Sequence, residues 1–275
     1  MKASFEIRSS ITDTAGASLF LEIGLHGISY LVINGNNECC ELVAYHFPAS
    51  VSNDAAAGWL KQIVSANTVL QEPFEKINII YAYPQSVLVP YQYMKHELKK
   101  DTLEMVYGDA QDVVIKTDYM YRHQLYNLYS VPKQVESSVA YLFSADNSQH
   151  RYSLLPDAVN NNGNNLYCIF NSSYFTVMLK KEGKLQVIQT FAFKTPEDTA
   201  YYLLHLCKSF DVNTADVQLH LNGMIDAASS LYSEISKYFL HIQFGRLPDN
   251  YTYPETMQAH PEHFFSHLFA MALCV

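Results

Sequence analysis

One stretch near the start of the chain constrains the fold more than any other. The run LFLEIGLHGISYLVI at 19–33 has two short apolar segments on either side of a turn that contains Gly24 and Gly27. Apolar residues alternate along the first segment, and β-branched and aromatic residues fill the second, as in a tight β-hairpin. A weaker copy, LYCIFNSSYFTVMLK, occupies 166–180. This repetition predicts a chain of two halves, each opening with such a hairpin.

The elements that follow each hairpin come in the same order. We expect a strand, a helix and a buried strand at 38–46, 54–68 and 76–83, and again at 185–193, 195–210 and 216–221. The fold class is therefore α/β, and each half is predicted to form a mixed five-stranded sheet in the order β-β-β-α-β-α-β. The predicted domains are 1–155, with an insertion at about 84–124, and 156–275. A single α/β domain with accidental symmetry stays open as an alternative.

The composition argues against several classes of protein. The 275 residues carry a net charge of −9, whereas a surface that binds duplex nucleic acid is basic. The 21 Tyr and 15 Phe could stack on single-stranded bases, but the 27 acidic residues outnumber the 18 basic ones. We therefore expect no nucleic-acid partner. No stretch approaches the roughly 18 apolar residues of a membrane-spanning helix, and the N-terminal segment lacks the apolar core of a signal peptide.

The cysteines indicate a reducing compartment. Their number, five, is odd, and no two of them form a CxxC pair. Most lie in apolar surroundings, which is typical of reduced, buried thiols. The sequence thus predicts a cytoplasmic protein.

The element order resembles that of the actin-like ATPase superfamily, whose ribonuclease H-like fold is duplicated and whose members include FtsA and PilM. The chain also resembles a family of uncharacterised Bacteroidetes proteins with this fold. The resemblance implies that each hairpin turn is a phosphate loop and that the end of the fourth strand of the second half lies near adenosine. The matching residues, which would contact nucleotide if any is bound, are Glu22, Gly24, His26, Gly27, Ser172, Ser173, Asn222 and Gly223.

The sequence departs from the superfamily at the acidic positions. Glu22 replaces the aspartate of the first loop, and its extra methylene moves the carboxylate by about 1 Å, which can cost on the order of a hundredfold in rate. Asn171 replaces the aspartate of the second loop and is neutral. Only Gly223 is kept of the glycine pair near adenosine. The retained glycines are also explained as turn residues that the fold itself requires.

These departures predict a non-catalytic protein that acts through protein–protein contacts. We expect no catalytic residue and no cofactor, or at most weak binding of Mg-ATP. The alternative is a divergent ATPase or small-molecule kinase that binds nucleotide between the domains. The insertion is the candidate docking surface, because its segment Tyr119–His123, followed by Tyr126 and Tyr129, is rich in the residue types that dominate interfaces. Core packing of most of these rings stays open as the alternative.

Histidines near the C-terminus raise the question of a metal site. His263 and His267 are four residues apart, a spacing that can bind zinc on a helix. The order EHFFSH does not match HExxH, and no third ligand is identifiable. We therefore expect no metal, and an amphipathic helix at 261–273 with its histidines on the polar side.

Overall fold

The computed structural model describes residues 2–10, 16–48, 52–109, 111–145, 147–159 and 162–275. The chain divides into two compact units. The first unit comprises Met1–Leu154, Asn250–Met257 and Val275, and the second comprises Leu155–Asp249 and Gln258–Cys274.

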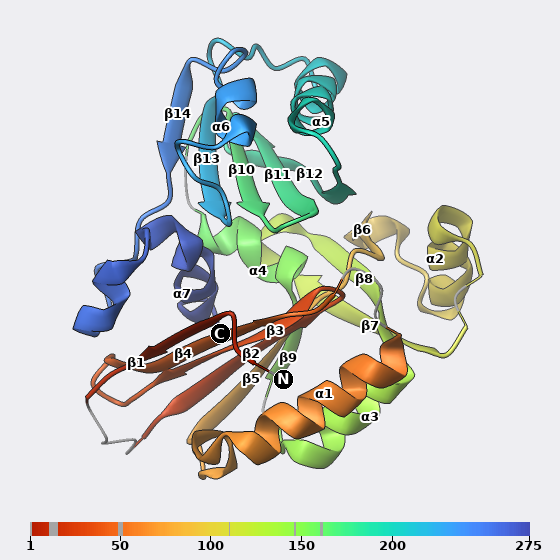
Figure 1. The fold of residues 1–275 in the computed structure, drawn as a ribbon. Coiled ribbons are helices and arrows are strands. Elements are labelled where there is room, and N and C mark those ends of the chain that lie inside the picture. The colour runs from red at the N-terminus through yellow and green to blue at the C-terminus, as the bar shows by residue number, and fades with distance from the viewer. Residues whose placement is uncertain (1, 11–15, 49–51, 110, 146, 160–161) are drawn as a thin grey trace. The chain divides into compact units, whose positions relative to one another are not determined.

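The first unit is built on a six-stranded mixed sheet with the strand order β1-β4-β3-β2-β5-β9 (Figure 1). The strands are β1 (Phe5–Arg8), β2 (Ser18–Gly24), β3 (Gly27–Ile33), β4 (Cys39–His46), β5 (Lys76–Ala82) and β9 (Asn147–His150). The predicted number of five is wrong, because β1 adds a sixth strand at the edge. This strand has only four residues and pairs antiparallel with β4, so its partner lies far away in the sequence.

Two helices, α1 (Asn53–Ala66) and α3 (Lys133–Leu142), lie side by side against this sheet (Figure 1). The core between sheet and helices contains Leu21 of β2, Leu60 and Ile63 of α1 and Val135 of α3, all almost fully buried. Each such side chain contributes about 1.5–3 kcal/mol through removal from water.

The insertion forms a sheet of its own with the order β6-β8-β7. Its elements are β6 (Ser86–Pro90), α2 (Lys99–Tyr107), β7 (Val113–Met120) and β8 (Leu125–Pro132). The inserted sheet therefore extends past the expected limit near residue 124, because β8 pairs with both β6 and β7. An apolar pattern can indicate the strand at 125–132, but it does not identify the strands with which it pairs.

The second unit holds a five-stranded sheet with the order β12-β11-β10-β13-β14. Along the chain its elements are β10 (Asn165–Phe170), β11 (Tyr174–Lys181), β12 (Lys184–Ala192), α5 (Pro196–Ser209), β13 (Gln218–Gly223), α6 (Ser230–Ile235), β14 (His241–Phe244) and α7 (Ser266–Ala272). The predicted α/β class is thus confirmed. Helix α5 begins with a capping box, in which Thr195 and Asp198 each accept a hydrogen bond from the other's backbone N–H.

The two faces of the second sheet differ in chemistry. Apolar side chains such as Leu166, Cys168 and Leu219 face α5 and α6 and form the core. Because side chains alternate along a strand, Tyr167 and His220 lie on the opposite face. That polar face carries the pocket described below.

Candidate functional site

The first hairpin turn lies where β2 and β3 end, with Gly24 paired with Gly27 across the hairpin. A Cβ atom on Gly27 would come within 2.4 Å of the carbonyl oxygen of Tyr45, and one on Gly24 within 3.0 Å of that of Ala82. Neighbouring strands therefore require both glycines, whether or not a phosphate is bound. His26, in the turn between them, is half-buried, and desolvation lowers its pKa.

Glu22, which replaces the aspartate of the first loop, is buried in β2 and forms an ion pair with Arg151. Arg151 Nη2 donates to Glu22 Oε1 at 2.6 Å, and Arg151 Nε donates to Oε2 at 3.0 Å. Both side chains are more than nine-tenths buried. Both carboxylate oxygens thus already bind a cation that belongs to the protein, in the bidentate geometry that guanidinium favours.

Arg151 is held in place by the segment that carries it. It is the first residue of α4 (Arg151–Ala158) and follows β9, which pairs with β5. His150 Nδ1 accepts a hydrogen bond from the N–H of Tyr152, and Nε2 donates to the carbonyl oxygen of Tyr83. Burial lowers the pKa of His150 to about 3, so its ring is neutral and both nitrogens serve structure.

A buried carboxylate links the insertion to the same segment. Asp118 of β7 accepts hydrogen bonds from the N–H of His150 at 2.7 Å, from Ser153 Oγ at 2.6 Å and from the hydroxyl of Tyr129 at 3.1 Å. Burial raises the pKa of Asp118, while these three donors act in the opposite direction. The network fixes the inserted sheet against the start of α4, close to the residue that neutralises Glu22.

In the second unit, the second turn and the expected adenosine position lie at neighbouring strand ends. Ser172 and Ser173 form the turn between β10 and β11, closed by a hydrogen bond from the N–H of Asn171 to the carbonyl oxygen of Tyr174. Gly223 ends β13 opposite Phe170, the last residue of β10. This unit therefore brings its four predicted site residues to the carboxyl ends of adjacent parallel strands.

The side chain of Asn222 is engaged by the protein. It is fully buried, its Nδ2 donates to the carbonyl oxygen of Cys168 at 3.2 Å, and its Oδ1 accepts from Ser266 Oγ at 2.7 Å. Asn222 therefore ties β13 to β10 and to α7.

A family model described as "Protein of unknown function (DUF3822)" matches residues 8–242. The chain belongs to this family. No curated protein matches it.

Solved structures confirm the actin-like resemblance of this DUF3822 chain. A Bacteroides thetaiotaomicron protein with actin-like ATPase fold and unknown function aligns with a TM-score of 0.75 and 17% identity, covering 91% of this chain and 97% of that one. A chain of the PilM–PilN type IV pilus biogenesis complex gives 0.67 and 11%, covering 95% and 98%. The ethanolamine utilization protein EutJ from Carboxydothermus hydrogenoformans gives 0.55 and 8%, covering 98% and 93%. These identities establish the fold alone.

The C-terminal histidines of the DUF3822 chain are buried, so their expected position on the polar side of a helix is wrong. His263 lies in a short 3₁₀ turn before α7, and its Nε2 lies 2.7 Å from the carbonyl oxygen of Ile225. His267 is on α7 and 7% exposed. Within the described part of the chain, no group of three or more His, Cys, Asp or Glu side chains could hold a metal ion.

Sequence reasoning did not find Arg151. It is the only Lys or Arg between Lys133 and Lys180, and an isolated cation beside apolar residues is a weak signal of burial. Its partner, Glu22, precedes it by 129 positions, and nothing in the local pattern joins the two.

No helix of the described residues is long and apolar enough to span a bilayer.

Proposed function

We propose that this DUF3822 protein is a non-catalytic, cytoplasmic member of the actin-like fold that acts through protein–protein contacts. One observation carries the proposal: the bidentate ion pair of Glu22 with Arg151 in the first hairpin. A magnesium ion needs an available anionic oxygen at this position, and here a guanidinium holds both. The loop residues therefore do not fit Mg-ATP.

The second unit supports the same proposal. Asn171 is neutral and is a weak ligand for a metal ion. The side-chain amide of Asn222 already forms hydrogen bonds with the carbonyl oxygen of Cys168 and with Ser266 Oγ. Freeing Glu22 for a metal would leave the guanidinium of Arg151 buried without its partner, at a cost of about 3–5 kcal/mol. Nucleotide binding would have to supply that energy before it stabilised the protein. Five thiols, four of them buried, accord with the proposed cytoplasmic location.

The test is thermal unfolding with Mg-ATP. We expect no change in Tm at millimolar Mg-ATP, whereas a nucleotide present at 100 times its Kd would stabilise the protein by about 2.7 kcal/mol. Samples with ATP plus EDTA and with MgCl₂ alone serve as controls for effects of either component. A magnesium-dependent rise in Tm, or ATP hydrolysis that Glu22→Ala abolishes, would overturn the proposal in favour of a divergent ATPase or kinase.

The protein-contact part of the proposal rests on four tyrosines in the strands β7 and β8 and in the 3₁₀ turns that follow β6 and β7, which we call the tyrosine cluster: Tyr91, Tyr119, Tyr121 and Tyr126. Tyr91 is 57% and Tyr121 79% exposed. The rings contact one another, with Tyr91 stacked on Tyr126 at 5.8 Å and Tyr119 lying 4.9 Å from Tyr126. Such mutually supported, exposed rings lose little entropy on binding, and tyrosine is enriched at interfaces.

The chemistry of the cluster favours a basic protein segment as the occupant. Tyrosine faces attract Lys and Arg side chains, and the net charge of −9 draws a basic partner toward this chain. The structural similarity to a chain of the PilM–PilN complex adds a fold relative that works with a protein partner.

Site-specific cross-linking in the native cell tests this contact. A photoreactive phenylalanine analogue at Tyr121 is expected to give a discrete cross-linked species whose captured peptide is rich in Lys or Arg. The same analogue at Tyr141 of α3, which is 83% exposed and outside the cluster, is the matched control. Equal cross-linking at both positions, or capture of acidic peptides at Tyr121, would contradict the proposed docking site.

A further inference from the structure

The polar face of the second sheet carries a pocket of about 400 Å³. Its floor includes Tyr167 of β10 and His220 of β13, which are in register on adjacent parallel strands, and Gln243 of β14 pairs with His220 on the other side. The walls come from α7, the end of α4 and the loop after β14, with Val159, Ala270 and Leu273 among the apolar contributors. All these residues belong to the second unit.

Hydrogen bonds fix the polar floor. His220 Nδ1 lies 2.9 Å from Gln243 Nε2, and His220 Nε2 lies 2.9 Å from Asn165 Oδ1. The amide Nε2 of Gln243 can only donate, so His220 accepts at Nδ1 and donates from Nε2. Burial lowers the pKa of His220 to about 4, which keeps the ring neutral. Gln243 is thereby oriented with its Oε1 left to accept a hydrogen bond.

Hydrogen-bonded side chains also fix the far end of the pocket. Gly245 follows β14, and a Cβ atom there would come within 1.9 Å of Asn222 Oδ1 and 2.7 Å of Ser266 Oγ. The absence of a side chain at Gly245 thus leaves room for the hydrogen bond between Asn222 and Ser266. At both ends of the pocket, hydrogen bonds within the protein therefore hold the lining side chains in place.

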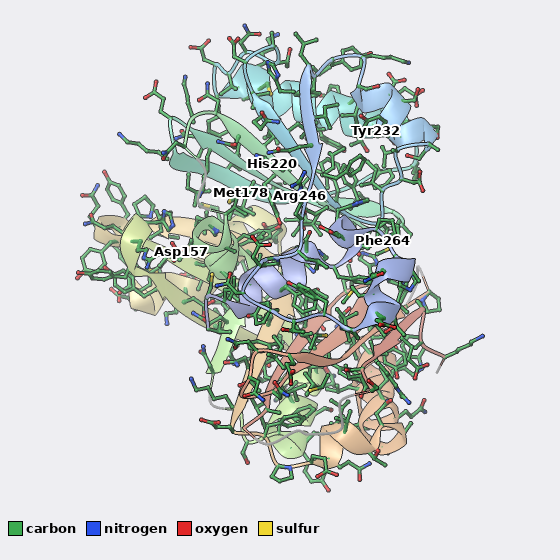
Figure 2. All side chains as sticks on the ribbon, turned by 90° about the vertical axis from the view of Figure 1, so that its left-hand side faces the viewer. Asp157, Met178, His220, Tyr232, Arg246 and Phe264 are labelled. Atoms are coloured by element: carbon green, nitrogen blue, oxygen red, sulfur yellow. The ribbon has the colours of Figure 1, made fainter. Side chains whose placement is uncertain are left out.

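Two groups that line this pocket have no partner among the described residues. The guanidinium of Arg246, exposed in the loop after β14, forms neither an ion pair nor a hydrogen bond with them. The hydroxyl of Tyr167 forms no hydrogen bond with them either, although the side chain is only 7% exposed. The lining residues include one cation, Arg246, and no Asp or Glu. Figure 2 labels His220 and Arg246 close together on this unit.

We infer that this pocket binds a small organic carboxylate that carries a second hydrogen-bonding group. The carboxylate pairs with Arg246, because a planar guanidinium matches a carboxylate in two parallel hydrogen bonds. The second group, such as a hydroxyl, meets the hydroxyl of Tyr167 or Oε1 of Gln243. The apolar walls contact the body of the ligand between its two polar ends.

The charge of the lining residues and the volume of the pocket restrict the class of ligand that fits. A single lining cation compensates a monoanion, whereas sites for phosphate groups with two charges usually supply more positive charge or several backbone N–H groups. The volume lies at the lower end of the range for small-molecule pockets, about 300–1,000 Å³. A molecule with one ring or a short chain fits this space.

Ligand titration by NMR tests the inference. The probes are 4-hydroxybenzoate, 4-hydroxyphenylacetate and 3-(4-hydroxyphenyl)propanoate, which place the carboxylate at three distances from the hydroxyl. With methyl-labelled protein, at least one probe is expected to shift the methyl signals of Ala270 and Leu273 saturably, with a Kd of about 1 mM or lower. The methyl signals of Leu60, in the core of the first unit, are expected to stay unchanged.

Three variants assign the contacts. Arg246→Gln is expected to weaken binding about tenfold or more, as loss of a charged hydrogen-bonded pair does. Tyr167→Phe keeps the ring and is expected to weaken binding several-fold. Lys208→Gln, which removes an equal charge from the exposed side of α5, is expected to change nothing. Failure of all three probes to saturate below about 10 mM, equal binding of their neutral amides, or an unchanged Kd in Arg246→Gln would each overturn the inference.

Discussion

Replacing Arg151 with alanine is expected to destabilise the first unit by about 3–5 kcal/mol. The substitution leaves the carboxylate of Glu22 more than nine-tenths buried and without its cation. A buried charge without a partner costs far more than the net value of the pair, because its desolvation is no longer compensated. Native-state hydrogen exchange of the backbone amides of β2, measured against urea concentration, reports this loss for the first unit alone.

A double variant separates the effect of the two charges on stability from the effect of the side-chain volumes. Glu22→Leu combined with Arg151→Met removes both charges and keeps similar volumes, and buried ion pairs replaced in this way often lose no stability. We expect the double variant to be close to the parent protein and far more stable than Arg151→Ala. If Arg151→Ala alone had parent-like stability, the ion pair would not hold Glu22, and the main argument against a metal ligand at this position would fail.

The local elements of the fold could be predicted because their signals are local. The hairpin glycines mark the turn at the end of β2, and Thr195 followed by Asp198 marks the start of α5 through a capping box. An almost continuous apolar run identified β5 as a buried strand. In each case the residues that determine the local element lie within a few positions of each other along the chain.

The parts that sequence reasoning missed depend on contacts between distant segments. The strand β1 exists because β4, more than thirty residues later, pairs with it. The ion pair of Glu22 with Arg151 and the position of β8 in the inserted sheet have the same character. No periodicity or capping signal encodes such a partner. The position of the C-terminal histidines was mispredicted for a related reason. His263 is buried and contacts the carbonyl oxygen of Ile225, a distant residue that the helical spacing could not indicate.

Replacing Gly223 with alanine is expected to destabilise the second unit by about 2–5 kcal/mol, through left-handed strain and overpacking together. Gly223 has φ +77°, and a Cβ atom there would come within 2.2 Å of the carbonyl oxygen of Phe170, on the neighbouring strand. Since that oxygen also accepts a hydrogen bond from the N–H of Met224, the backbone has no easy way to move aside. Urea unfolding followed by hydrogen exchange in β13 measures the effect.

Gly58→Ala is the matched control for Gly223→Ala, because Gly58 lies within α1 and an added Cβ atom would meet no atom within 4 Å. There the substitution is expected to stabilise the protein by about 0.5–1 kcal/mol. The comparison also bears on function, because the resemblance to the actin-like superfamily predicts that Gly223 lies near adenosine. A glycine kept for a ligand would tolerate alanine in the absence of nucleotide, whereas one kept for strand packing would not. A parent-like stability for Gly223→Ala would therefore return this residue to the list of nucleotide contacts, and a large loss would assign it to the architecture of the sheet.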